Sequence, residues 1–150
     1  MKDRPREVSA AKDRARFLRV KMTSAQRRAI VDHAARDAPN ECCGYLTAKD
    51  GVVQEVFEAE NIRHSPYGYD FGFKDLQAAN DLEDEGFEMA TYHSHPKSAA
   101  EPSQTDINLA NYPGWRYLIV SLEHGPEKAD LRAWKIEGKR VEEEEIVVTD

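Results

Sequence analysis

A strand that ends in two histidines restricts the fold of this chain more than any other feature of its sequence. The strand closes with His93-Ser94-His95, immediately before Pro96. Because side chains two apart on a strand point to the same face, both imidazoles can reach one point. Asp106 follows eleven residues after His95, beyond a loop of small residues long enough to fold back. Two histidines and one carboxylate, with a fourth position for water, are the ligand set of a catalytic zinc, whereas a structural zinc more often has four protein ligands.

The residues around Asp106 also have the pattern of a helix start. In Ser103-Gln104-Thr105-Asp106 the serine can cap a helix, and the aspartate falls in the first turn, where a negative charge is favoured. Ser103 can serve as a cap and as a site residue at the same time. Asp106 cannot offer the same lone pair to a metal and to a backbone N–H, so both interpretations of Asp106 stand at this point.

Short strands and helices follow one another without regular strand–helix–strand alternation. Thr23-Ser24-Ala25-Gln26 has the form of a capping box, and Pro39 ends the helix that it opens. Strands are predicted over 17–22, 42–47, 52–59, 69–73, 87–95, 117–122, 129–136 and 141–148. Helices are predicted over 23–36, 76–82 and 103–111. This order predicts an α+β fold, with a curved mixed β-sheet flanked by helices.

Length and charge set the wider expectations. The 150 residues favour one domain, and we expect a flexible tail over 1–15 and a single domain over 16–150. A net charge of -7 repels phosphate backbones, so nucleic acid is not an expected partner. No apolar run reaches the ~20 residues of a membrane span, and the charged N-terminus lacks the apolar region of a secretory signal. The two cysteines, Cys42 and Cys43, are adjacent and predict no disulfide framework, so we expect a cytoplasmic protein without membrane contact.

Two motifs in this chain match a known pair of signatures. His93-Ser94-His95-Pro96, six residues, Ser103, two residues and Asp106 fit the pattern H-[ST]-H-P-x₆-S-x₂-D, and Pro39-Asn40-Glu41-Cys42-Cys43-Gly44 fits P-x-E-x-C-G. Over about residues 17–140 the chain resembles the JAMM (MPN-plus, Mov34/PAD-1) metalloproteases. Its compact size is similar to that of the bacterial stand-alone members, especially those resembling the peptidase that releases cysteine from a ubiquitin-like sulfur carrier. The resemblance implies the MPN fold, which is cytidine deaminase-like.

The same resemblance implies a role for each residue of the two motifs. His93, His95 and Asp106 would bind one Zn²⁺ per chain, which would activate water for hydrolysis. Glu41 would act as general base and later protonate the leaving amine, and Ser103 would donate a hydrogen bond to the developing oxyanion. The implied substrate is a peptide or isopeptide bond at the C-terminal tail of a ubiquitin-like (β-grasp) protein or its conjugate.

Other hypotheses remain beside this one. The chain could be a non-catalytic MPN scaffold or a module that binds ubiquitin-like proteins, or a zinc hydrolase of small amides, and iron or manganese could take the place of zinc. Cys43 and Gly44 are interpreted as structural residues, while His64 and Tyr69 could line a substrate groove. The acidic run 142–145 is interpreted as a solvated strand face or a protected edge. The sequence predicts no oligomeric state.

Overall fold

The computed structural model describes residues 19–150. The predicted tail over 1–15 and the first two residues of the predicted strand over 17–22 lie outside this range. The strands are β1 (Arg19–Thr23), β2 (Cys43–Lys49), β3 (Val52–Ala59), β4 (Glu88–His95), β5 (Arg116–Ser121), β6 (Asp130–Glu137) and β7 (Arg140–Thr149). The helices are α2 (Ser24–Asp37), α3 (Phe73–Asp84), α4 (Gln104–Asn108) and the short 3₁₀ turn η1 (Pro126–Lys128).

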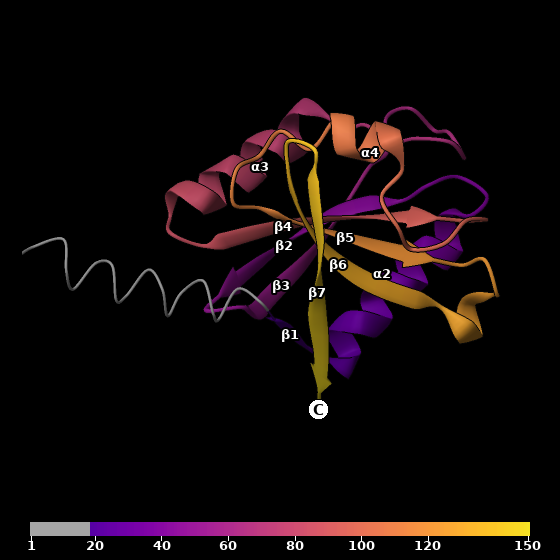
Figure 1. The fold of residues 1–150 in the computed structure, drawn as a ribbon, viewed down its shortest axis with the longest axis horizontal. Helices are drawn as coiled ribbons and strands as arrows, with labels where there is room; N and C mark the ends of the chain where they lie inside the picture. Colours follow the sequence, from indigo (N-terminus) through magenta and orange to yellow (C-terminus); the bar gives the residue numbers. More distant parts are fainter. Residues whose placement is uncertain (1–18) are drawn as a thin grey trace, which may run out of the picture.

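The strands close into a barrel in the order β1-β3-β2-β4-β5-β6-β7. Strand directions are mixed, because β4 runs parallel to β5 and β1 parallel to β7, while the hairpins β2–β3 and β6–β7 are antiparallel. A single parallel pair, Lys21 with Val52, joins β1 to β3 and completes the ring. Figure 1 shows α3 and α4 on one side of the strands and α2 on the other. The predicted α+β class and curved mixed sheet are confirmed, and the curvature continues to closure.

Helix α2 forms where its capping box predicts. The Thr23 hydroxyl accepts a hydrogen bond from the Gln26 backbone N–H, and the Gln26 side chain accepts one from the Thr23 N–H. These two bonds satisfy N–H groups that have no partner inside the helix. Ile30 and Ala34 on the inner stripe of α2 are fully buried and pack in one core cluster with alternate residues of the central strands. Helix α2 therefore covers one face of the sheet.

The two central strands, β4 and β5, are buried on both faces. Every residue of β5 is buried, and so is every residue of β4 after Glu88. Tyr92 and Leu118 point to the α2 side and join its cluster. Met89 and Tyr117 point to the opposite side and join a second cluster with α3 and the segment after α4. His93 and His95 share the parity of Met89, so they face α3 and α4.

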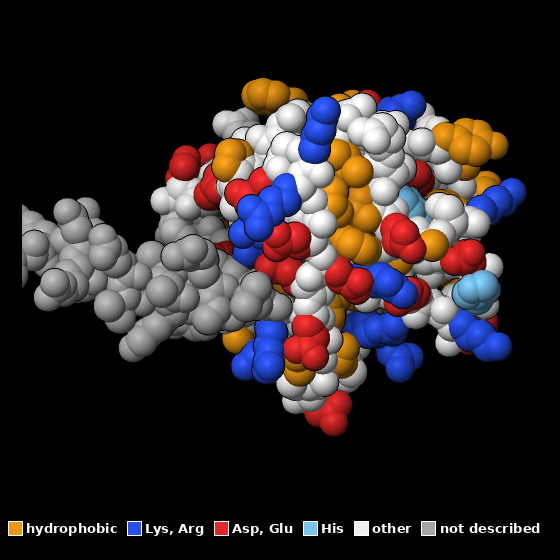
Figure 2. All heavy atoms as spheres, viewed as in Figure 1, with side chains coloured by type: hydrophobic (Ala, Val, Ile, Leu, Met, Phe, Trp, Pro, Cys, Tyr) orange, Lys and Arg blue, Asp and Glu red, His pale blue; other side chains and the backbone are white. Residues whose placement is uncertain are grey.

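The second core cluster reaches the protein surface beside the β6–β7 hairpin. Figure 2 shows hydrophobic side chains gathered in a strip between β7 and α4. Half-buried members of this cluster include Ile107 of the α4 helix, Trp134 of β6 and Val141 of β7. Among residues 19–150, no helix has the length and apolar character needed to cross a membrane.

The predicted strand over 69–73 is wrong. Only Phe71 makes a bridge, to Asn61, and Phe73 already begins α3. The loop is instead held by the buried Asn61 side chain, whose carbonyl accepts hydrogen bonds from the N–H groups of Arg63 and Asp70. Because one side chain takes the place of a partner strand, alternating aromatics do not produce a strand here. Helix α3 also begins before the predicted residue 76, and α4 ends before the predicted residue 111.

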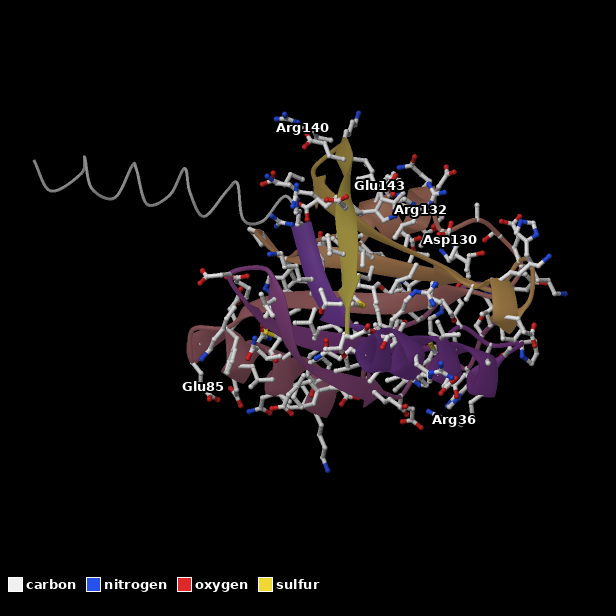
Figure 3. The ribbon with its side chains drawn as sticks, turned by 90° about the horizontal axis from the view of Figure 1, so that it is seen from below. Arg36, Glu85, Asp130, Arg132, Arg140 and Glu143 are labelled. Carbon is white, nitrogen blue, oxygen red and sulfur yellow. The ribbon has the colours of Figure 1, made fainter. Side chains whose placement is uncertain are left out.

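The interpretation of the acidic run 142–145 as a solvated face fails at one position. Glu144 is buried and pairs with the equally buried Arg116 of β5 inside the barrel. Its neighbours follow the prediction: Glu143 is exposed and lies 3.6 Å from Arg132, which in turn binds Asp130 at 2.9 Å. Figure 3 shows Asp130, Arg132 and Glu143 close together on β6 and β7. Alternation places Glu142 and Glu144 on the same face of β7, and of these two only Glu144 is buried.

Candidate metal centre

Three side chains converge at the end of β4. The Nε2 atoms of His93 and His95 lie 3.2 Å apart. The Oδ1 atom of Asp106 is 3.2 Å from His93 Nε2, and its Oδ2 atom is 3.1 Å from His95 Nε2. Ligands about 2.0 Å from a tetrahedral zinc lie roughly 3.3 Å from one another, so the two imidazole nitrogens and the carboxylate are spaced as three ligands of such a zinc would be. The residues fit a zinc ion with one open position.

The His95 ring is held in a fixed orientation by a backbone carbonyl. Its Nδ1 atom lies 2.7 Å from the carbonyl oxygen of Ala99, which fixes the N–H there and turns the Nε2 lone pair toward the other ligands. The loop that carries Ala99 is itself anchored on both sides. Ser121 donates a 2.6 Å hydrogen bond to the Ser98 carbonyl, and the Trp134 indole donates a 3.0 Å bond to the Ala100 carbonyl. Sequence analysis found none of these supporting residues.

His93 is the most deeply buried of the three candidate ligands. Burial lowers its pKa despite the nearby carboxylate of Asp106, and the ring stays neutral with a lone pair for a metal. One face of the ring stacks on Tyr69, with 4.5 Å between ring centroids and 24° between planes. The loop over 61–72 thus supplies a wall of the site. Tyr69 and His93 are 24 positions apart in the sequence, so no local pattern predicts this contact, which only the fold creates.

Asp106 serves the helix and the metal site together. Its backbone N–H donates to the Ser103 hydroxyl at 3.1 Å, and its Oδ2 accepts the Ser103 N–H at 2.9 Å, so the predicted cap of α4 is present. Among residues 19–150 no backbone N–H donates to Oδ1, which faces His93. Burial alone would raise the pKa of Asp106, but the close contacts of its carboxylate with the His93 and His95 rings hold that pKa well below its usual range. Because one carboxylate oxygen accepts the backbone N–H and the other is free of it, Asp106 can cap the helix and still offer a lone pair to a metal.

Glu41 reaches the same site from the segment just before β2. Cys43 pairs with His93, and the Ser94 N–H binds the Cys42 carbonyl, so continuing this register sets Glu41 beside His95. The Glu41 backbone is fixed by hydrogen bonds with Ser65 and Asn61. Burial raises the pKa of Glu41 to about 7, with Asp106 adding to the rise and His95 opposing it. The carboxyl can therefore both accept and return a proton near neutral pH.

The remaining residues of the upstream motif have packing roles. Gly44 lies against Tyr92, whose ring would be 2.2 Å from any Cβ added at Gly44, so only glycine fits. Cys42 and Cys43 are buried free thiols. Burial raises the pKa of Cys42 to about 12 and raises that of Cys43 as well, which makes both poor nucleophiles. His64 lines an open polar pocket together with Glu41.

Comparison with known proteins finds a matching family model, similar sequences and similar solved structures. Residues 23–137 match the Prok-JAB family model, which describes prokaryotic homologs of the JAB domain. The chain is 35% identical over 127 residues to the CysO-cysteine peptidase of Mycobacterium tuberculosis strain H37Rv, covering 81% of this chain and 86% of that protein. It is 32% identical over 114 residues to the desampylase of Haloferax volcanii, covering 69% and 81%. The solution structure of protein DSY2949 from Desulfitobacterium hafniense superimposes with a TM-score of 0.72 at 32% identity, covering 87% and 93%.

Proposed function

The chain belongs to the Prok-JAB family and is a hydrolase of the JAMM metalloprotease type, and from this premise we propose that it is a zinc-dependent peptidase acting on the C-terminal tail of a ubiquitin-like protein. The observation that carries the proposal is the convergence of His93, His95 and Asp106 at mutual distances of 3.1 to 3.2 Å. A zinc ion held there would act as a Lewis acid on the scissile carbonyl and lower the pKa of water at its open position. We propose one zinc per chain.

The protein's own groups divide the proton transfers between them. Glu41, with a pKa near neutrality, takes the proton from the attacking water and passes it to the leaving amine. The Ser103 hydroxyl accepts the Asp106 N–H at 3.1 Å and still has its own hydrogen to donate. That hydrogen is available to the oxyanion that develops on the scissile carbonyl. Capping and catalysis are thus compatible at Ser103.

The proposed substrate class is inferred from the names of two similar proteins. One of them is named CysO-cysteine peptidase and the other is named desampylase. We propose that this chain hydrolyses a peptide or isopeptide bond at the tail of a β-grasp sulfur carrier or a related modifier. The cytoplasmic location expected from the sequence, and the single domain over 16–150, belong to the same proposal.

Zinc content is the first test of this function. We expect about one zinc per chain in the purified protein and loss of that zinc in His95→Ala. The matched control is His124→Ala, which removes an exposed histidine outside the site. Zinc-loaded protein should then release cysteine from a β-grasp carrier extended by one cysteine. A protein that binds such carriers, takes up no zinc and cleaves nothing would instead support the scaffold hypothesis.

A further inference from the structure

Glu41, the proposed general base, lies outside the ladders of the sheet. The pairing of β2 with both of its neighbours begins at Cys43, two residues later. The main chain of Glu41 is held instead by the loop over 61–72. Its N–H donates to the Ser65 carbonyl at 2.9 Å, and its carbonyl accepts a hydrogen bond from the Asn61 side chain at 2.9 Å. The position of the Glu41 carboxyl therefore depends on this loop.

Asn61 uses all of its hydrogen-bonding capacity inside the loop. The residue is 5% exposed, and an asparagine amide has two donor hydrogens and an oxygen with two lone pairs. Its Nδ2 donates to the carbonyls of Glu41 at 2.9 Å and Gly68 at 3.0 Å. Its Oδ1 accepts the N–H groups of Arg63 at 3.0 Å and Asp70 at 3.2 Å. Two carbonyls on one side and two N–H groups on the other require an amide, because a carboxylate has no hydrogen to donate.

The Asn61 amide is also linked to a candidate metal ligand. Gly68, whose carbonyl accepts one of the Asn61 hydrogens, directly precedes Tyr69. The Tyr69 ring stacks on His93 with 4.5 Å between ring centroids. One buried side chain therefore joins the main chain of Glu41 to the segment that packs against His93.

The turn between Asn61 and Ser65 has a conformation that needs support from its surroundings. His64 has a φ of 48°, in the left-handed region that residues with a side chain rarely adopt. Its N–H donates to the Asn61 backbone carbonyl at 3.1 Å. Such strain persists only where neighbouring contacts over-determine the backbone. Loss of the Asn61 side-chain contacts should let this turn relax and withdraw the Ser65 carbonyl from the Glu41 N–H.

We infer that Asn61 is a positioning residue that holds Glu41 at the distance from the candidate metal ligands that proton transfer requires. This inference rests on the proposed function, because it gives Glu41 the role of general base. Asn61 itself contacts neither the candidate ligands nor the substrate in this account and acts through the main chain of Glu41. A misplacement of about 1 Å in a catalytic group can cost about 10²-fold in rate, so a single buried amide is enough to matter.

The first test is Asn61→Asp in the full-length, zinc-loaded protein. The aspartate can still accept the N–H groups of Arg63 and Asp70, but it loses both donated hydrogen bonds. With a β-grasp carrier extended by one cysteine as probe, we expect kcat to fall about tenfold or more, with zinc content and KM little changed. The matched control is Asn80→Asp, which makes the same substitution at an exposed residue of α3 and should keep kcat.

A double-mutant cycle separates positioning of Glu41 from a general loss of structure. If Asn61 acts through Glu41, adding Asn61→Asp to Glu41→Gln should change kcat by no more than about twofold, since no general base remains to be misplaced. If the two substitutions lower kcat independently, their effects multiply, and the inference is overturned while the proposed function stands.

Amide hydrogen exchange of the metal-free protein tests the same contact without any activity. Asn61→Asp should speed exchange of the Glu41 N–H by about tenfold or more, whereas the Asp70 N–H keeps its acceptor and its protection. Unchanged exchange at Glu41 would overturn the inference. If circular dichroism shows that Asn61→Asp is unfolded, Asn61→Ser, which is uncharged and one bond shorter, replaces it in each measurement. A wild-type protein that cleaves no carrier would refute the proposed function, and exchange at Glu41 would then report separately on whether Asn61 holds its backbone.

Discussion

At the scale of single residues, Glu41 combines two properties that oppose each other. Its carboxyl is buried, and burial raises its pKa to about 7, which suits a group that accepts and returns a proton at neutral pH. The same burial makes the ionised carboxylate costly to the fold. Activity and stability should therefore respond in opposite directions when this charge is removed.

Replacing Glu41 by Gln should lower kcat by about 10² to 10⁴, the usual contribution of a general base, and leave the zinc content unchanged. In the wild-type protein kcat/KM should fall as acid protonates Glu41. A bound cation favours the carboxylate, so the midpoint should lie between the ordinary value of 4.5 and about 7. Steady-state kinetics from pH 4 to 9 measures this fall of kcat/KM on the acid side. The control is Glu60→Gln, which changes an exposed acid of the same pocket and should leave the pH dependence of kcat/KM unchanged.

The same substitution should stabilise the metal-free protein at alkaline pH. The pKa of Glu41 is higher in the folded state than in the unfolded state, so stability is fully present below about pH 4.5 and declines as pH rises through about 7. The difference corresponds to at most ~3 kcal/mol. Glu41→Gln should raise the free energy of unfolding at pH 8 by up to this amount and change little at pH 4. Urea titrations at pH 4 and pH 8 measure this difference. An equal effect of the substitution at both pH values would refute the raised pKa of Glu41.

At the scale of elements, the site depends on how closely β2 and β4 approach each other. Gly44 on β2 faces Tyr92 on β4, and the Tyr92 hydroxyl reaches His33 of α2 at 2.6 Å. This contact lies between the strand that follows Glu41 and the strand that carries His93. A side chain at Gly44 would push the two strands apart and separate Glu41, the proposed general base, from the candidate metal ligands.

Gly44→Ala should therefore destabilise the protein by roughly 1–3 kcal/mol, the usual cost of overpacking, or more if the backbone cannot shift. The added Cβ would also meet the Phe57 carbonyl oxygen at 2.4 Å, and backbone cannot rotate away as a side chain can. Thermal unfolding of the metal-free protein measures the effect. Gly72→Ala is the matched control, because its Cβ would meet only Ile62, at 3.4 Å, and should cost much less.

At the scale of the whole molecule, a buried ion pair spans the barrel. Arg116 lies on β5 and Glu144 on β7, and both strands pair with β6 between them. The pair therefore joins strands that have no backbone ladder with each other. Burial raises the pKa of Glu144, against the opposing effect of Arg116, so the carboxylate depends on its partner to stay charged.

Glu144→Ala should cost about 3–5 kcal/mol of stability, because it removes a buried carboxylate that pairs with a buried guanidinium. Glu142→Ala, at an exposed acid of the same strand, should change stability by no more than about 0.5 kcal/mol. Denaturant unfolding of both variants makes the comparison. Equal costs would mean that the Arg116–Glu144 pair does not contribute to the closed barrel.

The sequence by itself determined the helix α2, the two hairpins and the spacing of His93, His95, Ser103 and Asp106, since capping, turns and strand parity are local properties. It also indicated Glu41, through a motif rather than through any physical proximity along the chain. Only the tertiary structure decided that Glu41 falls beside His95, that Tyr69 stacks on His93, and that Glu144 turns inward to Arg116. These contacts join residues 24 to 54 positions apart, and their formation depends on strand register and barrel closure, which no local pattern encodes. The mistaken strand over 69–73 has the same cause: its aromatics alternate as in a strand, but the folded chain offers them a buried asparagine and a histidine ring in place of a partner strand.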